Sequence, residues 1–155
     1  ESTNFIMGLR DRRQPPIMRV LSSTGAPMKH LEPKQAAEFL KQNRNAIFVD
    51  CRSEMEYLFV GHPVGAIHIA WNDGPNWDIN PHFVAHVKKA TSVDRPVVVI
   101  CRSGNRSLDA GRALEEAGFT QVFNVLHGFE GELDDNHHRG STTGWRFDGL
   151  PWEQC

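Results

Sequence analysis

Residues 97–107 read Val97-Val98-Val99-Ile100-Cys101-Arg102-Ser103-Gly104-Asn105-Arg106-Ser107. The run of β-branched residues that opens this stretch is typical of a strand buried on both faces, as in a parallel sheet. A helix is predicted after it, because apolar residues recur at helical spacing from Ala110 to Ala117 and Gly118 supplies a stop. The stretch therefore predicts a strand, a short loop that begins at Cys101, and a helix.

Segments on either side repeat this alternation. Residues 46–49, 66–69 and 122–125 are short apolar runs that predict further strands. Helices are expected to begin at Pro33, and at Asn80 followed by proline, because proline is tolerated in a first helical turn. Strands alternating with helices predict an α/β domain with a mainly parallel sheet.

The two ends of the chain carry weaker patterns. Residues 1–27 contain prolines and little periodicity, so we expect a partly ordered leader there and the domain over residues 28–155. Residues 132–155 read as a loop-like tail. Its large apolar side chains are expected to pack back on the domain, namely Trp145, Leu150 and Trp152.

Composition narrows the class of protein. The 155 residues suit one domain, and a net charge of −2 gives no electrostatic reason to expect nucleic acid or a membrane surface as partner. No apolar run approaches the roughly 20 residues that a membrane helix needs. Three cysteines without a CxxC pair indicate reduced thiols in a cytoplasm. No pattern specifies an oligomeric state or a cofactor.

Cys101 lies where ligands bind in open α/β sheets, at the carboxyl end of a strand and before a helix. The helix dipole and two nearby arginines are expected to lower the pKa of its thiol from about 8.5. Gly104 and Asn105 tolerate left-handed backbone, so successive N–H groups can turn inward around an anion. We therefore expect Cys101 to be the nucleophile and the loop to bind an anion, through Arg102, Ser103, Gly104, Asn105, Arg106 and Ser107.

Other reactive residue types receive a structural interpretation. Cys51 follows a buried strand and is expected to fill space, and nothing around the terminal Cys155 activates it. Residues 134–138 hold carboxylates and imidazoles, but adjacent residues rarely converge on one ion, so we expect a solvated loop and no metal site. His127 lies at a strand end and is a candidate for the rim of a pocket.

Four segments together resemble the rhodanese family, in the family's order and over residues from about 30 to 152. They are Cys101–Ser107, Asp50–Tyr57, the turn Gly61–Ala66, and the closing glycines Gly128–Gly131, Gly144-Trp145 and Gly149–Pro151. The resemblance implies an open, parallel, five-stranded sheet flanked by helices. It implies transfer of sulfane sulfur from an anionic donor such as thiosulfate to a thiol, a protein or cyanide, through a persulfide on Cys101. It also implies that Asp50 and Arg52 support the site.

The sequence departs from the family pattern at three places. Cys51 stands where an aliphatic residue is usual, and the turn at residues 61–66 reads Gly-His-Pro-Val-Gly-Ala, with proline and aliphatic residue exchanged. Residues 132–143 lengthen the closing segment. The first two departures are expected to affect packing, and the third to shape the rim of the pocket.

Two alternatives stay open. Dual-specificity phosphatases and arsenate reductase-like enzymes use a similar loop, but phosphatases of that kind place one more residue between cysteine and arginine than the four between Cys101 and Arg106. The smaller ring suits one sulfur atom better than a phosphate ester. A non-catalytic interaction module is the other alternative, and the intact Cys101 argues against it. Trp71 and Trp77 are expected to pack in a loop or to wall the site.

Overall fold

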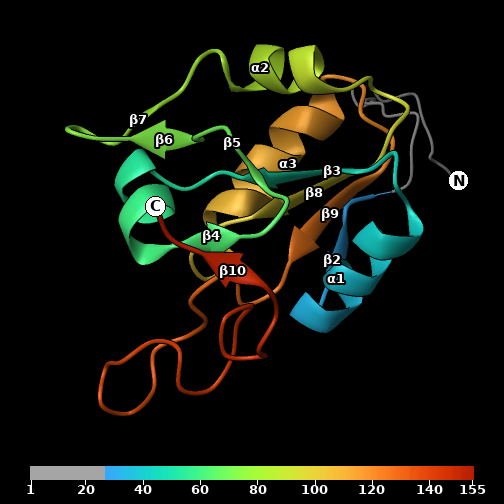
Figure 1. Cartoon of the computed structure of the whole chain (residues 1–155). Coiled ribbons are helices and arrows are strands. Elements are labelled where there is room, and N and C mark those ends of the chain that lie inside the picture. Colours follow the sequence, from blue (N-terminus) through green and yellow to red (C-terminus); the bar gives the residue numbers. More distant parts are fainter. Residues whose placement is uncertain (1–26) are drawn as a thin grey trace, which may run out of the picture.

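The computed structural model describes residues 27–155, so the leader expected over residues 1–27 lies outside the described residues except for Pro27. The central feature is a five-stranded sheet in which all neighbouring strands are parallel (Figure 1). Its strands, in spatial order, are β2 (Lys29–Leu31), β9 (Val122–Val125), β8 (Val97–Ile100), β3 (Ile47–Asp50) and β5 (Ile67–His68).

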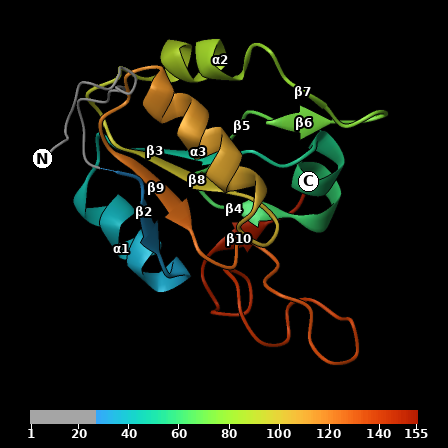
Figure 2. The ribbon, with the colours of Figure 1, turned by 180° about the vertical axis from the view of Figure 1, so that it is seen from behind.

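Helices cover both faces of this sheet. Helix α1 (Pro33–Gln42) lies on one face, and helices α2 (Phe83–Ala90) and α3 (Arg106–Glu116) lie on the other, as the two opposite views show (Figures 1 and 2). Alternate residues of β8 therefore enter different cores: Val97 and Val99 pack toward α2 and α3, and Val98 packs toward α1.

The helix ends follow from local chemistry. Pro33 occupies the first turn of α1, and Gln35 Oε1 accepts a hydrogen bond from the Glu32 N–H at 2.9 Å. Helix α3 ends before Gly118, whose φ of +103° is a conformation that L side chains rarely adopt. Helix α2 begins at Phe83, later than the start expected at Asn80, because the Asn80 side chain accepts a hydrogen bond from the His82 N–H and forms a turn.

Several short elements went unrecognised in the sequence. Strand β10 (Trp152–Glu153) pairs antiparallel with β4 (His62–Pro63), and β6 (Asn72–Asp73) pairs with β7 (Asp78–Ile79). A π-helix, η1, spans Glu56–Val60. Two-residue strands are too short to show an alternating pattern, so only their pairing defines them.

The tail packs on the domain as expected, although it ends in a strand and is not loop throughout. Trp145 is buried and its ring centroid lies 5.2 Å from that of Phe48, while Leu150 packs against the same core. The Trp152 and Phe129 rings pack in a T-shaped arrangement, with centroids 5.9 Å apart. Within residues 27–155, none of the helices has the length and apolar character needed to cross a membrane.

Candidate active site

The loop between β8 and α3 surrounds the sulfur of Cys101. The Gly104 N–H donates to Cys101 Sγ at 3.1 Å and the Ser107 N–H donates to it at 3.4 Å, while Ser107 Oγ lies 3.2 Å away. Gly104 has a φ of +105°, which turns its N–H inward at no steric cost. Cys101 is 1% exposed, so these contacts replace water around the sulfur.

This environment favours the thiolate. The neighbouring Cys51 thiol contributes most to lowering the pKa of Cys101, and burial works in the opposite direction. The Ser107 hydroxyl and the N–H groups of Ser107 and Gly104 add to the lowering, and together they bring the pKa to about 5. Cys101 is therefore a thiolate near neutral pH, the form that acts as a nucleophile. From the sequence, this lowering was expected from the N-terminus of the helix and from two arginines. The Ser107 and Gly104 N–H groups at the helix start contribute to it, and the Cys51 thiol and the Ser107 hydroxyl take the place of the arginines.

Arg106 is engaged by a carboxylate. Its Nη1 donates to Glu56 Oε1 at 2.8 Å and its Nη2 to Glu56 Oε2 at 2.9 Å. Burial opposes ionisation of Glu56, but the bidentate contact with Arg106 and hydrogen bonds from Ser53 lower its pKa to about 2. The charge of Arg106 is thus largely compensated, which leaves Arg102 as the loop arginine without such a partner in the described part of the chain.

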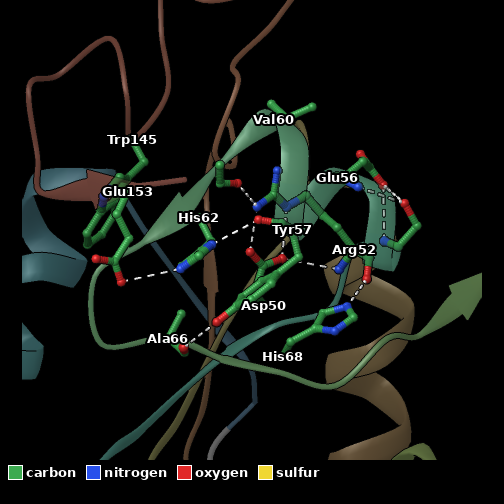
Figure 3. Close-up of polar contacts among 12 residues, drawn as sticks. Asp50, Arg52, Glu56, Tyr57, Val60, His62, Ala66, His68, Trp145 and Glu153 are labelled. Atoms are coloured by element: carbon green, nitrogen blue, oxygen red, sulfur yellow. Dashed lines mark hydrogen bonds and ion pairs between the residues drawn. The ribbon is translucent and has the colours of Figure 1, made fainter. Parts of the chain in front are cut away.

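Asp50 and Arg52 form a buried ion pair that stabilises the backbone near the site. Arg52 Nε donates to Asp50 Oδ1 at 2.8 Å and Nη2 donates to Asp50 Oδ2 at 2.6 Å. The same Nη2 donates to the Gly61 carbonyl at 2.5 Å, and the guanidinium lies 4.5 Å from the centre of the Phe129 ring. Both side chains are fully buried, and this pair ties the end of β3 to the turn before β4 (Figure 3).

A group of aromatic and imidazole rings surrounds that ion pair (Figure 3). The Tyr57 ring stacks on the His62 ring, with centroids 3.9 Å apart, and on the His68 ring, with centroids 4.7 Å apart. His68 Nε2 lies 2.7 Å from the Arg52 carbonyl, and His62 Nε2 lies 3.4 Å from Glu153 Oε2. These contacts connect η1, β4 and β10, and so hold in place the element that carries Glu56.

The closing glycines dock onto the backbone of the loop. The Phe129 N–H donates to the Cys101 carbonyl at 2.8 Å and the Glu130 N–H donates to the Arg102 carbonyl at 2.9 Å. Gly128 has a φ of +64°, and a Cβ at this position would clash with the Cys101 carbonyl. The backbone can approach this closely because Gly128 has no side chain.

Sequence reasoning missed Asn124, a buried polar residue in strand β9. Ser107 Oγ lies within hydrogen-bonding distance of the Asn124 side chain, and Asn124 Nδ2 lies 3.3 Å from His30 Nδ1. Ser107 Oγ therefore contacts both Asn124 and the Cys101 sulfur. The sequence did contain an indication of a buried polar contact at this position, because an asparagine within an otherwise apolar strand needs a buried hydrogen-bond partner.

A cavity of about 600 Å³ opens beside the loop. Arg102 and Arg106 form part of its wall together with Ser53, Met55, Glu56, Val60, Trp77 and Glu130. Of the two tryptophans considered in the sequence, Trp77 lines this cavity, whereas Trp71 packs edge-on against Phe83 at 5.3 Å. His127 does not line the cavity, because its ring instead lies 2.7 Å from Glu132 and 3.4 Å from Glu32.

Ser103 and Asn105 are not among the groups that contact Cys101 Sγ, and Asn105 adopts a right-handed conformation, so Gly104 alone makes the left-handed turn of the loop. The Asp134 carboxylate accepts hydrogen bonds from its own loop, from the N–H groups of Asn136 and His138 and from Ser141 Oγ.

Comparison with known proteins identifies the family of the chain. Residues 32–133 match the family described as Rhodanese-like domain. Thiosulfate sulfurtransferase GlpE of Haemophilus influenzae is 32% identical over 105 residues, which cover 68% of this chain and 88% of that protein. GlpE of Pseudomonas putida is 34% identical over 102 residues, which cover 66% of this chain and 82% of that protein.

Solved structures share the fold of the chain. The crystal structure of Rv0390 from M. tuberculosis superposes with a TM-score of 0.74 at 41% identity. The match covers 86% of this chain and 100% of that chain. The polysulfide-sulfur transferase homodimer from Wolinella succinogenes superposes with a TM-score of 0.58 at 24% identity, covering 83% and 80% of the two chains, and shares the fold.

The chain belongs to the rhodanese-like domain family, as its motifs predicted. The all-parallel five-stranded sheet flanked by helices confirms the fold expected from that resemblance. Named relatives in this family are thiosulfate sulfurtransferases, so the family to which the chain belongs is one of sulfurtransferases.

Proposed function

We propose that this protein transfers sulfane sulfur from an anionic donor such as thiosulfate to a thiol or to cyanide, through a persulfide on Cys101. The observation that carries the proposal is the hydrogen bonding of Cys101 Sγ by the N–H groups of Gly104 and Ser107. A thiolate held in this way is both activated and desolvated. The names of the GlpE relatives support the same donor.

In the first half-reaction the Cys101 thiolate attacks the outer sulfur of thiosulfate. The sulfur–sulfur bond of thiosulfate breaks, sulfite leaves with the electron pair, and Cys101 carries a persulfide. Arg102 lines the cavity beside the loop and supplies the positive charge that attracts a dianionic donor. In the second half-reaction an acceptor thiolate or cyanide attacks the outer sulfur and restores the Cys101 thiolate.

The geometry disfavours the phosphatase alternative. Phosphoryl transfer needs donors around three spread oxygens, including an arginine free to bind them. Here the ring between Cys101 and Arg106 holds four residues, and both Nη atoms of Arg106 donate to Glu56.

The three free cysteines fit a reducing compartment such as the cytoplasm.

The test is thiosulfate:cyanide transfer measured as thiocyanate, beside hydrolysis of p-nitrophenyl phosphate by the same preparation. We expect thiocyanate from the wild-type protein and none from Cys101→Ser, with negligible phosphate release from both. Phosphatase turnover that depends on Cys101, without sulfur transfer to any acceptor, would assign the site to the alternative. Absence of both activities with intact fold would favour a non-catalytic module.

A further inference from the structure

Two buried thiols lie on neighbouring strands, and the proposed sulfur transfer uses one of them. Strands β3 and β8 are parallel with Val49 opposite Val99 and Asp50 opposite Ile100. The Cys51 N–H donates to the Ile100 carbonyl at 3.0 Å and continues this ladder by one residue. Cys51 and Cys101 therefore follow the two strands at matching positions.

Both side chains point to the same face of the sheet. Val49, Cys51, Val99 and Cys101 pack in one core cluster, as alternation along two strands in register requires. Neighbouring strands lie about 4.8 Å apart, and disulfides join Cα atoms that are about 4.4–6.8 Å apart. The backbone thus already holds these two cysteines at a spacing that a disulfide can bridge.

The two thiols differ in their protonation. Burial, together with the adjacent Cys101, raises the pKa of Cys51 well above its ordinary value, so Cys51 carries a proton where Cys101 does not. Cys51 is fully buried, whereas the cavity lined by Arg102 opens to solvent. Cys51 therefore lies on the core side of Cys101, and we expect donors and acceptors to approach from the side of the cavity beside the loop.

We propose that Cys51 is a resolving thiol that attacks Sγ of the Cys101 persulfide, releases sulfide and leaves a Cys51–Cys101 disulfide. The inference rests on the proposed persulfide. The Cys51–Cys101 S–S bond forms as the bond between Cys101 Sγ and the outer sulfur breaks. The outer sulfur takes that electron pair and the Cys51 proton, and departs as HS⁻. The sulfane sulfur is reduced and the two cysteines are oxidised, so no external oxidant is needed.

This step gives the protein a second outcome for the same loaded sulfur. When an acceptor occupies the cavity, it takes the outer sulfur and Cys51 stays a thiol. When no acceptor is present, Cys51 discharges the sulfur as sulfide. A dithiol reductant then reduces the Cys51–Cys101 disulfide by thiol–disulfide exchange and becomes a disulfide itself. The net reaction converts thiosulfate and a dithiol into sulfite, sulfide and an oxidised dithiol.

The experiment loads the full chain with thiosulfate, without cyanide or any reductant. All proteins carry Cys155→Ser, so that the exposed terminal thiol cannot take part. The parent is compared with Cys51→Val, which removes the thiol, and with Cys51→Ser, which keeps a hydrogen-bond donor beside Cys101. Sulfite, sulfide and intact mass are measured, and a non-reducing peptide map locates any disulfide.

We expect the parent to release sulfite and about one equivalent of sulfide per chain, and to lose ~2 Da as the Cys51–Cys101 disulfide forms. Both Cys51 variants should load more slowly than the parent, because loss of the Cys51 thiol raises the pKa of Cys101. Once loading is complete, they should have released sulfite, gained ~32 Da as a stable persulfide and released no sulfide. Cyanide added to the loaded variants should yield thiocyanate.

The outcomes separate the two proposals. If the parent keeps a stable persulfide and releases no sulfide, as the variants do, sulfur transfer stands and the resolving role of Cys51 is overturned. If sulfide appears equally from parent and variants, Cys51 is again not its source. If none of the three proteins releases sulfite or gains sulfur, Cys101 is not loaded and both proposals fall.

Discussion

Glu56 and Arg106 form a bidentate ion pair, with Nη1–Oε1 at 2.8 Å and Nη2–Oε2 at 2.9 Å, that joins η1 to the first residue of α3. Both side chains are mostly buried, so the pair is shielded from solvent screening. It fixes the start of the helix whose N-terminal turn holds the Cys101 sulfur. The pair therefore couples the wall of the cavity to the geometry of the nucleophile.

The first prediction concerns the pH dependence of this pair. The folded pKa of Glu56 is about 2, below the ordinary value of 4.5 for a glutamate side chain, so the stabilisation from the ion pair is present above the unfolded pKa and is lost as pH falls from about 5 to about 2. Glu56→Gln should lower the free energy of unfolding by about 1–3 kcal/mol at pH 7. Urea unfolding at several pH values should show this difference shrinking toward pH 2, and a constant difference would contradict it.

The second prediction tests what lowers the pKa of Cys101. Ser107→Ala removes the hydroxyl 3.2 Å from Sγ and keeps the backbone N–H, so the pKa should rise from about 5. One lost hydrogen bond corresponds to a rise of roughly one unit. Ser103→Ala, on the same loop but without a contact to the sulfur, is the control. The measurement is the rate of iodoacetamide alkylation against pH in a Cys155→Ser background, and coincident curves would exclude a role for the hydroxyl.

The local part of the site was predictable, and the long-range part was not. The strand, loop and helix around Cys101 are contiguous, so periodicity, glycine and the helix start specify them. The contact between Glu56 and Arg106 spans 50 residues, and that between Ser107 and Asn124 spans 17. Such pairs depend on how separate elements pack, which periodicity along the chain does not encode.

The position of Cys51 illustrates the same limit. Its location after a buried strand was readable, and it is fully buried as expected for a structural residue. That it lies beside Cys101 follows from β3 pairing with β8 in the register Asp50 opposite Ile100. Strand order and register are properties of the assembled sheet, so a contribution of Cys51 to the pKa of Cys101 was not visible in the sequence.

The third prediction concerns the buried brace between β3 and the turn before β4. Asp50→Asn leaves the Arg52 guanidinium buried with its carboxylate partner removed, and Arg52 Nη1 already has no hydrogen-bond partner within the described residues. Loss of one member of a buried ion pair costs about 3–5 kcal/mol. Chemical denaturation should show a loss of this size. A loss below about 1 kcal/mol, the range of surface pairs, would mean that the pair does not brace the fold.

The fourth prediction uses two glycines with positive φ. A Cβ at Gly128 would clash with the Cys101 carbonyl, whereas a Cβ at Gly65 would meet nothing within 4 Å. Gly65→Ala should therefore cost only the left-handed conformation, about 1–2 kcal/mol, and leave thiocyanate formation unchanged. Gly128→Ala should be more destabilising and should reduce kcat, because it displaces the loop backbone at Cys101. Equal effects of the two substitutions would contradict this account.

The last prediction concerns how an anionic donor is attracted. Arg106 is compensated by Glu56, so Arg102 is the loop cation left to face a dianion in the cavity. Arg102→Ala should raise KM for thiosulfate by roughly 10-fold or more, the loss of about 1.5–3 kcal/mol expected for a charge-assisted contact, with a smaller effect on kcat. Arg102→Lys should recover much of the loss, because a positive charge is retained. Higher ionic strength should raise KM of the wild type more than that of Arg102→Ala. If Arg102→Ala and wild type share the same KM and the same salt dependence, the donor is not held by Arg102, and the loop N–H groups bind it without help from a side-chain charge.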